Sequence, residues 1–369
     1  MGQGVTVVLE APEQVGLHTY DLPEPGQGQV LVQMARANVC GSELHNYKGN
    51  HPNATFGGVM GHEGLGTIAR LGPGRTVDAT GAPISEGDRV VATYFECCRA
   101  CPPCQRGDFN LCRNAYVNRW RPAAEPPHFH GTFGSHYLVH TNQYLYKVPD
   151  ALSDRIAAGA NCAVAQMLYA IEVAGLRPGE TVLVQGAGGL GLAAVAAARA
   201  TGCRIVVTEV AEERLTQARA FGAHDVIDVA ALDAVGTRKA IEQRLQDDGV
   251  DAVMELTGVG PAMEIGVAAL RPGGRYISVA LGAGQPMSLG ASALTRSGAV
   301  LRGVMRYQPW FLGKALAFLT DHADLPWERL IDAEYDLADV SDALADAGAR
   351  RVVRPSLIPS LAAGRSSVD

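Results

Sequence analysis

The sequence predicts an α/β protein with two domains, a strand-rich domain followed by a doubly wound parallel sheet. Its 369 residues and 38.8 kDa exceed one small core and fit two domains well. The first 150 residues hold short apolar runs between turn-forming glycines and prolines. From Thr181, strand-like runs alternate with alanine-rich helix-like runs. This alternation implies right-handed crossovers and a parallel sheet.

The strand-rich part is predicted from four apolar runs, VTVVL, GQVLVQMARANV, GHEGLGTIARLG and GDRVVATYF. In each run apolar residues alternate or cluster, and β-branched residues are frequent. Turn formers separate the runs. This pattern is typical of short antiparallel strands in a barrel-like domain.

Four closely spaced cysteines form the most specific motif of the chain, Cys98-Arg-Ala-Cys101-Pro-Pro-Cys104 followed by Cys112. Two-residue gaps let a tight turn direct neighbouring thiolates at one tetrahedral zinc ion. The motif therefore predicts a closed structural zinc site. A disulfide cluster is the alternative, but nothing else in the chain indicates secretion. Cys97 offers a second register, and the even spacing favours Cys98.

Composition excludes several classes of protein. With 47% hydrophobic and 19% charged residues the chain can bury a large core and is not disordered. A net charge of −7 and a pI near 5.8 argue against nucleic acid or an anionic membrane as the main partner. No apolar run approaches the roughly 18 residues of a membrane span, and the start lacks a signal-peptide pattern. Eight cysteines without a secretory address suggest a reducing compartment. We expect a cytoplasmic protein.

A glycine-rich loop, GAGGLG at 186–191, follows the strand-like TVLVQ and precedes the helix-like LAAVAAARA. Glycines there permit a tight turn and close approach of a pyrophosphate to the helix N-terminus. The next strand, RIVVTEV, brings Glu209, which can bind the adenosine ribose and repel a 2′-phosphate, so NAD is favoured over NADP. Glu209 as a solvated carboxylate is the alternative, and Arg214 can weaken the preference. The predicted cofactor-binding residues are Gly186, Gly188, Gly189, Leu190, Gly191, Glu209 and Arg214.

The pattern changes again after about Val304. Helix-like WFLGKALAFLTDH and ADVSDALADAGA follow, and the tail PSLIPSLAAGRSSVD is small and polar. We expect this tail to be frayed.

A second set of possible metal ligands is scattered along the chain. Cys40 begins the run CGSELH, His62 lies in GHE, and Cys162 lies in NCAV. Taken singly, a cysteine is usually a small buried hydrophobe, and a histidine is usually a satisfied polar group. Together, two cysteines and one histidine supply three zinc ligands and leave a fourth position open. Catalytic zinc sites are built this way.

These motifs, in this order, resemble the zinc-containing medium-chain alcohol dehydrogenases over almost the whole chain. The similarity rests on CGSELH, GHEGLG, the four-cysteine lobe and GAGGLG. PHFHGTFGSHYLV and GANCAVAQMLYAIEVAGL are similar to the branch containing 5-exo-hydroxycamphor dehydrogenase. The resemblance implies a GroES-like catalytic domain at 1–163 with a structural-zinc lobe at 97–112. It further implies a Rossmann NAD-binding domain at 164–306, and a return to the catalytic domain, with a flexible tail, at 307–369.

The resemblance also implies roles for individual residues. Cys40, His62 and Cys162 would ligate the catalytic zinc, and Glu63 would be an alternate ligand or would lie beside the metal. Ser42 would contact the substrate hydroxyl and start a proton relay through the cofactor ribose to His45. A turn-capping Ser42 and a merely exposed His45 are the alternatives.

Two positions depart from the family pattern. Glu43 stands where many members have aspartate, and its longer side chain would orient His62. Gln166 replaces the usual threonine, so contacts near the nicotinamide would differ.

The implied function is reversible hydride transfer between a secondary or cyclic alcohol and NAD, with two zinc ions per chain, in a homodimer or homotetramer. Alternatives are an NADP-linked, zinc-independent reductase, a redox-neutral epimerase and a non-catalytic module on the same fold. Position suggests Phe56, Trp120, Phe129 and Met305–Trp310 as pocket-lining residues, although aromatic residues there equally suit a core.

Overall fold

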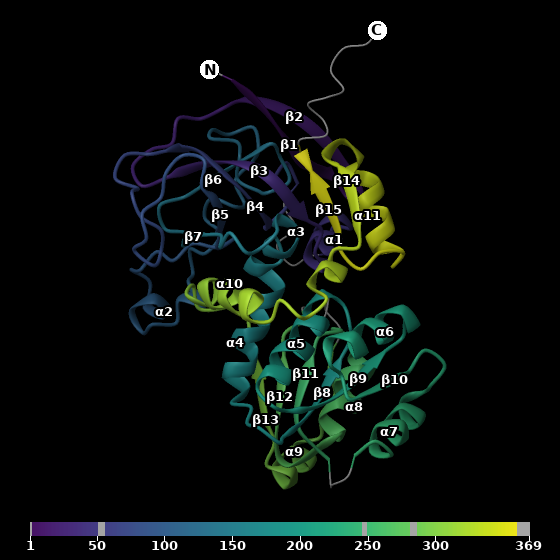
Figure 1. Cartoon of the computed structure of the whole chain (residues 1–369). Helices are drawn as coiled ribbons and strands as arrows, with labels where there is room; N and C mark the ends of the chain where they lie inside the picture. The colour runs from purple at the N-terminus through teal and green to yellow at the C-terminus, as the bar shows by residue number, and fades with distance from the viewer. Residues whose placement is uncertain (1, 51–55, 246–248, 281–285, 360–369) are drawn as a thin grey trace. The chain divides into compact units, whose positions relative to one another are not determined.

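The computed structural model describes residues 2–50, 56–245, 249–280 and 286–359, and it divides into two compact units (Figure 1). The first unit holds the chain up to Ala165, Gln308–Ala323 and the part from Trp327 onward. The second holds Gln166–Tyr307 and Asp324–Pro326.

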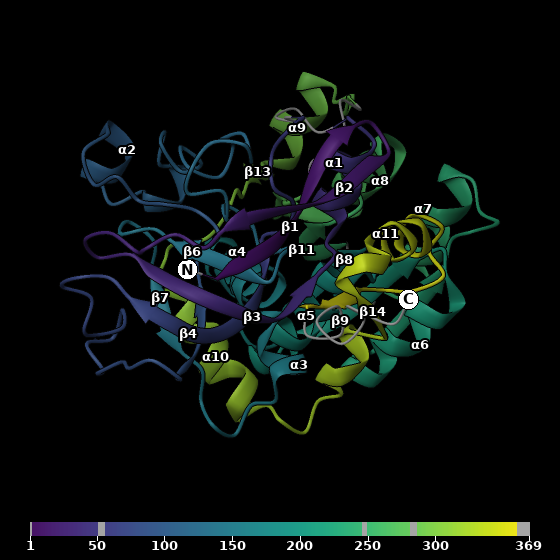
Figure 2. The ribbon, with the colours of Figure 1, turned by 90° about the horizontal axis from the view of Figure 1, so that it is seen from above.

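The first unit is built on two sheets. A two-stranded antiparallel sheet pairs β1 with β2, which run side by side in Figure 2. A larger sheet has the order β14-β15-β3-β4-β5-β7, with β6 also paired to β3. The strands are β1 (Gln3–Ala11), β2 (Gln14–Asp21), β3 (Val30–Asn38), β4 (Glu63–Leu71), β5 (Arg89–Ala92), β6 (His136–Val139), β7 (Leu145–Lys147), β14 (Ala333–Asp336) and β15 (Pro355–Ile358).

Strand β3 lies at the centre of this sheet because its apolar residues suit burial. Val30, Val32 and Met34 face a core cluster that includes Ile68 of β4 and Leu145 of β7. A strand buried by pairing on both edges and packing on one face contributes strongly to the free energy of folding. Three of the four apolar runs thus become β3, β4 and β5 around this core, whereas VTVVL becomes part of β1, whose Val7 and Leu9 lie in a second core cluster.

The expected fraying of the C-terminal tail is wrong for its first residues. Pro355–Ile358 form β15, which pairs parallel to β14 and antiparallel to β3. Leu357 is 0% exposed and packs in a core cluster with Val7. The small and polar composition of this segment suggested fraying, but pairing with β14 and β3 gives its backbone groups hydrogen-bond partners. Residues 360–369, the rest of the predicted tail, lie outside the described residues.

Helices of the first unit connect and cover these strands. The helical stretch Asp154–Ala174, which begins in the first unit and ends in the second, is by length and composition apolar enough to cross a membrane, which corrects the expectation that no run approaches that length. Of its apolar window 72% is buried inside the protein, as in a core helix. The helices are α1 (Gly41–Tyr47), α2 (Pro102–Gln105), η1 (Phe109–Leu111), α3 (Asp154–Ala157), the π-helical turn η2 (Ala160–Val164), α10 (Phe311–Asp321), η3 (Trp327–Leu330), η4 (Leu337–Asp339) and α11 (Val340–Gly348).

The second unit is a six-stranded sheet of order β10-β9-β8-β11-β12-β13, with every pairing parallel. The order reverses at β8, so the chain is doubly wound, as the strand–helix alternation predicted. The strands are β8 (Thr181–Gln185), β9 (Arg204–Glu209), β10 (Asp225–Asp228), β11 (Val250–Glu255), β12 (Leu270–Ser278) and β13 (Val300–Gly303). The helices are α4 (Ala165–Ala174), α5 (Gly189–Ala200), α6 (Glu212–Phe221), α7 (Ala234–Glu242), α8 (Gly260–Ala268) and α9 (Ala291–Ser297).

Candidate functional site

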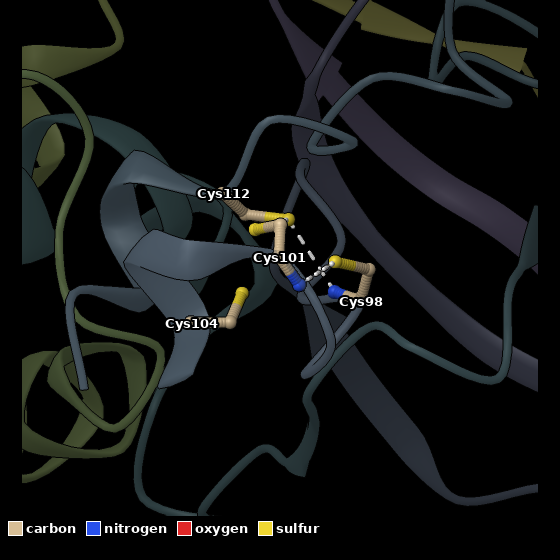
Figure 3. Close-up of side chains that lie close together, drawn as sticks. All are labelled: Cys98, Cys101, Cys104 and Cys112. Carbon is tan, nitrogen blue, oxygen red and sulfur yellow. Dashed lines mark hydrogen bonds between the residues drawn. The ribbon is translucent and has the colours of Figure 1, made fainter. Parts of the chain in front are cut away.

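The four predicted structural ligands converge in space (Figure 3). The sulfur atoms of Cys98, Cys101, Cys104 and Cys112 all lie within 4.8 Å of one another, and no disulfide joins them. Four thiols without a disulfide, mostly buried, match the donor set of a closed tetrahedral zinc site. We call this group the four-cysteine cluster.

Local backbone geometry explains why these thiols meet. Cys101 precedes α2, whose two prolines start a helical turn that carries Cys104, and η1 returns the chain to Cys112. The backbone N–H of Cys101 donates to Cys98 Sγ at 3.4 Å, and that of Cys98 donates to Cys112 Sγ at 3.4 Å. Hydrogen bonds from the backbone N–H groups of Ala100 and Cys101 lower the pKa of Cys98 to about 6, which favours the thiolate.

Cys97 takes no place in this cluster. Its side chain is buried, and its sulfur lies 3.9 Å from the backbone oxygen of Phe109. The register with Cys98 is therefore the one in which the thiols come together.

A second group joins residues that are far apart in the sequence. Cys40, His62, Glu63 and Cys162 each offer one ligand atom, and these atoms lie within 4.8 Å of one another. His62 Nε2 lies 3.4 Å from Cys162 Sγ, and the sulfur atoms of Cys40 and Cys162 are 4.0 Å apart. We call this group the mixed cluster. All of its residues belong to the first unit.

Glu43 holds His62 in a defined orientation. Glu43 Oε1 lies 2.5 Å from His62 Nδ1, and Glu43 Oε2 accepts from the backbone N–H of Cys40 at 3.1 Å. Because Nδ1 is engaged by the carboxylate, Nε2 faces the two sulfur atoms. Burial alone lowers the pKa of His62, but Glu43 and Cys40 raise it to about 10. The position of Glu43 agrees with the role expected for it.

Glu63 is completely buried between an ion pair and the cluster. Its Oε2 accepts from Arg354 Nη1 at 2.9 Å and from Asn38 Nδ2 at 3.5 Å. Its Oε1 has no hydrogen-bond partner among the described residues and lies 4.0 Å from His62 Nε2. Burial raises the pKa of Glu63 to about 7, against the opposing effect of Arg354. An unpaired buried carboxylate oxygen beside two thiols and an imidazole fits a zinc ion at this place.

Arg354 is a site residue that sequence reasoning missed. It is buried, and its Nη2 lies 4.0 Å from Cys40 Sγ. The run ARRVVRP around it resembles an ordinary solvated basic surface. The sequence offers one indication of burial, because Arg354 directly precedes a short apolar segment. That segment becomes β15, whose place in the sheet explains why Arg354 is buried.

The proposed relay residues lie on α1, next to the mixed cluster in the chain. Ser42 and His45 are both half-buried and stand three positions apart, so they share one side of the helix. Cys40 stands at the N-terminal cap of the same helix, so one predicted metal ligand and both relay candidates lie on or directly before α1.

Two residues that the sequence placed near the substrate or the nicotinamide, Phe129 and Gln166, are both buried. Phe129 is completely buried in a core cluster with Leu31 and Leu138, so it does not line a pocket. Gln166 is buried, and its Nε2 has no hydrogen-bond partner among the described residues.

The glycine-rich loop depends on its glycines for a tight turn into α5. Gly186 has φ +92°, which favours glycine, and a Cβ on Gly191 would lie 2.0 Å from the oxygen of Gly186. Gly188 caps α5, so Gly189 and Leu190 open that helix with its free N–H groups. A Cβ on Gly188 would meet only Arg214 Nη1, at 4.0 Å. The space above this helix N-terminus suits a phosphate.

Glu209 is turned inward, so a solvated strand-end carboxylate is wrong. Its side chain is 7% exposed. Oε2 accepts from the backbone N–H of Ala187 at 2.8 Å, and Oε1 accepts from that of Val210 at 2.7 Å. Glu209 thereby ties the end of β9 to the glycine-rich loop.

Comparisons with known proteins show that the chain is similar to alcohol dehydrogenases along most of its length. Residues 26–150 match the model of an alcohol dehydrogenase GroES-like domain, and residues 189–321 match that of a zinc-binding dehydrogenase. The chain is 28% identical to 5-exo-hydroxycamphor dehydrogenase of Pseudomonas putida, over 95% of this chain and 97% of that protein. It is 32% identical to an alcohol dehydrogenase of Rhizobium meliloti, over 77% and 79% of the two chains. A crystal structure of an alcohol dehydrogenase from Thermotoga maritima superimposes with a TM-score of 0.89 at 26% identity, over 97% of this chain and 100% of that one.

Proposed function

We propose that this chain exchanges a hydride between a secondary or cyclic alcohol and NAD. The premise is that the chain belongs to the zinc-containing medium-chain alcohol dehydrogenases and is an oxidoreductase acting on alcohols. Zinc and a nicotinamide dinucleotide are its cofactors. The substrate class, the preference for NAD and the roles of individual residues are the parts that we propose.

The observation that carries the proposal is the mixed cluster. Cys40, His62 and Cys162 would hold a zinc ion through two sulfurs and one nitrogen, which leaves a position for the substrate oxygen. A zinc ion bound there would act as a Lewis acid on the alcohol or carbonyl oxygen. Glu43 keeps the Nδ1 proton of His62 in place, so that Nε2 remains the ligand atom. Arg354 offsets the negative charge of Glu63 and of the thiolates.

Proton transfer is assigned to α1. Ser42 would accept the proton of the substrate hydroxyl while it passes its own proton on, and His45 would release a proton to water at the far end of the path. The half-buried state of both side chains suits a path that joins a dry reaction site to solvent.

The nucleotide-binding unit would supply the hydride acceptor. A bound NAD accepts or returns the hydride at its nicotinamide ring. The glycine-rich loop and the N-terminus of α5 would hold the pyrophosphate, and Glu209 and Arg214 would face the adenosine ribose. A carboxylate that is buried and fixed by backbone N–H groups disfavours a 2′-phosphate through charge repulsion. Paired kcat/KM values for NAD and NADP, in the parent and in Glu209→Ala, test this preference: equal or better use of NADP by the parent contradicts it.

The proposal also covers the oligomeric state of the protein and its location in the cell. Strand β13 is an edge of the parallel sheet, and Val300 on it is 55% exposed. A second copy pairing at this edge would bury both strands in a homodimer or a homotetramer built from such dimers. All eight cysteines are free thiols, which suits a reducing compartment, so we place the enzyme in the cytoplasm. A net charge of −7 favours small molecules over nucleic acid or an anionic membrane as its partners.

A spectrophotometric screen for NADH formation with secondary, cyclic and primary alcohols tests the function, with zinc measured in the same preparation. We expect NADH from secondary or cyclic alcohols and a zinc content close to two per chain, one for each cluster. Interconversion of epimers without net NADH would favour a redox-neutral enzyme. Activity with NADPH in zinc-free protein would favour a zinc-independent reductase.

A further inference from the structure

We propose that Arg119 is a positioning residue for the mixed cluster and that it acts through Glu43. The inference rests on the proposed function in one respect, that the mixed cluster binds zinc.

Arg119 is a buried cation directed at Glu43. Its side chain is 8% exposed, and its Nη2 lies 3.9 Å from Glu43 Oε1, the oxygen that engages His62 Nδ1. Arg119 Nη1 donates to the backbone oxygen of Val59 at 3.4 Å. Glu43 itself is 1% exposed. Burying a carboxylate to this degree costs free energy unless a cation lies beside it, and Arg119 is such a cation.

The charges of the metal-loaded cluster support this assignment. Two thiolates, Glu63 and Glu43 carry four negative charges within this buried region. A zinc ion would contribute two positive charges, and Arg354 contributes a third through its ion pair with Glu63. Arg119 contributes the fourth, next to Glu43. Without Arg119 the buried site would keep an unbalanced negative charge at the carboxylate that orients His62.

The surroundings of Arg119 are shaped to hold its guanidinium. The group lies over the ring of Trp120, with 5.5 Å between its carbon and the ring centroid. The group also lies close to Gly131, where a Cβ would lie 2.9 Å from Nη1. A side chain at Gly131 would therefore displace the cation. This is a built position for a guanidinium and not a chance surface contact.

The chain segment that carries Arg119 is anchored beside the four-cysteine cluster. Ala115 donates its backbone N–H to the oxygen of Cys112 at 3.3 Å. Asn118 Nδ2 donates to Glu96 Oε1 at 2.9 Å, and the backbone N–H of Glu96 donates to the oxygen of Ala115 at 2.9 Å. Glu96 stands just before the first cysteines of that cluster. These hydrogen bonds hold the segment that presents Arg119 to Glu43.

Arg119→Met tests the proposal, with Arg121→Met as the matched control. Arg121 lies on the same segment, but its partner Glu125 is exposed at the surface. The zinc affinity of each cluster is measured by competition with a chromogenic chelator, without substrate or NAD. Loss of an outer-shell contact typically weakens metal binding by about 10–100-fold, and for this indirect contact we expect about tenfold, at the mixed cluster only. Arg121→Met should match the parent.

Two further variants separate positioning from general stability. Arg119→Lys keeps the charge and should recover part of the lost affinity, whereas Arg119→Gln keeps a donor for Val59 and should not. Parent-like zinc affinity in Arg119→Met, or equal recovery by lysine and glutamine, would overturn the proposal. If Arg119→Met does not fold, the lysine and glutamine variants decide by the same comparison. A parent protein that binds only the four-cysteine zinc would contradict the proposed function instead.

Discussion

The two clusters of metal-ligand residues are built in contrasting ways. In the four-cysteine cluster all ligands come from one short segment, and backbone N–H groups donate to the sulfurs of Cys98 and Cys112. In the mixed cluster the ligands come from the cap of α1, the start of β4 and the turn η2. Side-chain charges support them, namely Glu43 on His62 and Arg354 on Glu63.

The difference suits the structural and the catalytic task that we propose for the two clusters. A closed set of four thiolates can be specified locally and needs no open position. An open site must leave one position for a substrate while it buries several charges, so it needs fixed partners from distant parts of the fold. The mixed cluster therefore depends on tertiary structure at every ligand, and its function is the more easily damaged.

The largest loss of activity is expected when His62, one of the proposed zinc ligands of the mixed cluster, is replaced. His62→Ala removes a ligand from the mixed cluster, and we expect kcat to fall by about 10³-fold or more, as when a main electrostatic stabiliser of the reaction is lost. Elemental analysis should show that the zinc of the four-cysteine cluster is retained. A variant with parent-like kcat would remove His62 from the proposed site.

Cys104→Ser should produce the opposite kind of damage. Because Cys104 belongs to the closed cluster, its loss should lower folding stability or assembly rather than turnover by the folded fraction. Thermal unfolding and size-exclusion chromatography measure the first, and kcat per folded, zinc-loaded molecule measures the second. If the variant is stable and only kcat falls, the two clusters do not divide the tasks as we propose.

A smaller effect is expected on α1, beside the mixed cluster. His45→Gln leaves the metal ligands intact and interrupts only the exit of the proton, so the rate should fall by about 10²-fold or less. The rate should recover as pH rises, because hydroxide can then take the proton. Parallel pH profiles for His45→Gln and the parent would show that His45 takes no part in the relay.

A pair of buried histidines, with no carboxylate bound to either ring among the residues that the structure describes, sharpens the contrast with His62. His130 and His140 stack with their ring centroids 5.8 Å apart, and burial, aided by nearby positive groups such as Arg121, lowers the pKa of each to about 4. The unfolded chain, with an ordinary histidine pKa near 6.5, binds protons that the folded protein does not. The free energy of unfolding should therefore fall by about 1.4 kcal/mol per histidine for each pH unit between about 6.5 and 4, and change no further below that range.

Urea unfolding at pH 7.5 and pH 5, with zinc in excess, measures this loss. His130→Phe should unfold with a weaker dependence on pH than the parent, because one of the two buried imidazoles is removed. An unchanged dependence would show that His130 is protonated in the folded state.

Features that depend only on residues close together in the sequence were predictable from the sequence. The four-cysteine motif, the strand–helix alternation and the loop at 186–191 are each contained in a short stretch, so spacing alone indicates their structure. Family resemblance, rather than spacing, was needed to group Cys40, His62 and Cys162, because more than a hundred residues separate the first from the last.

Only the tertiary structure decided what surrounds the mixed cluster. Arg354 and Arg119 look like ordinary surface cations in the sequence, yet both are buried, one against Glu63 and the other near Glu43. Strand β15 likewise lay within an expected frayed tail, and pairing with β3 made it a core strand. The sequence by itself determined the elements and the local metal motif, because those follow from local hydrogen bonding and hydrophobic periodicity. The partners of buried charges follow from long-range packing, which places a cation wherever a buried carboxylate would otherwise be uncompensated.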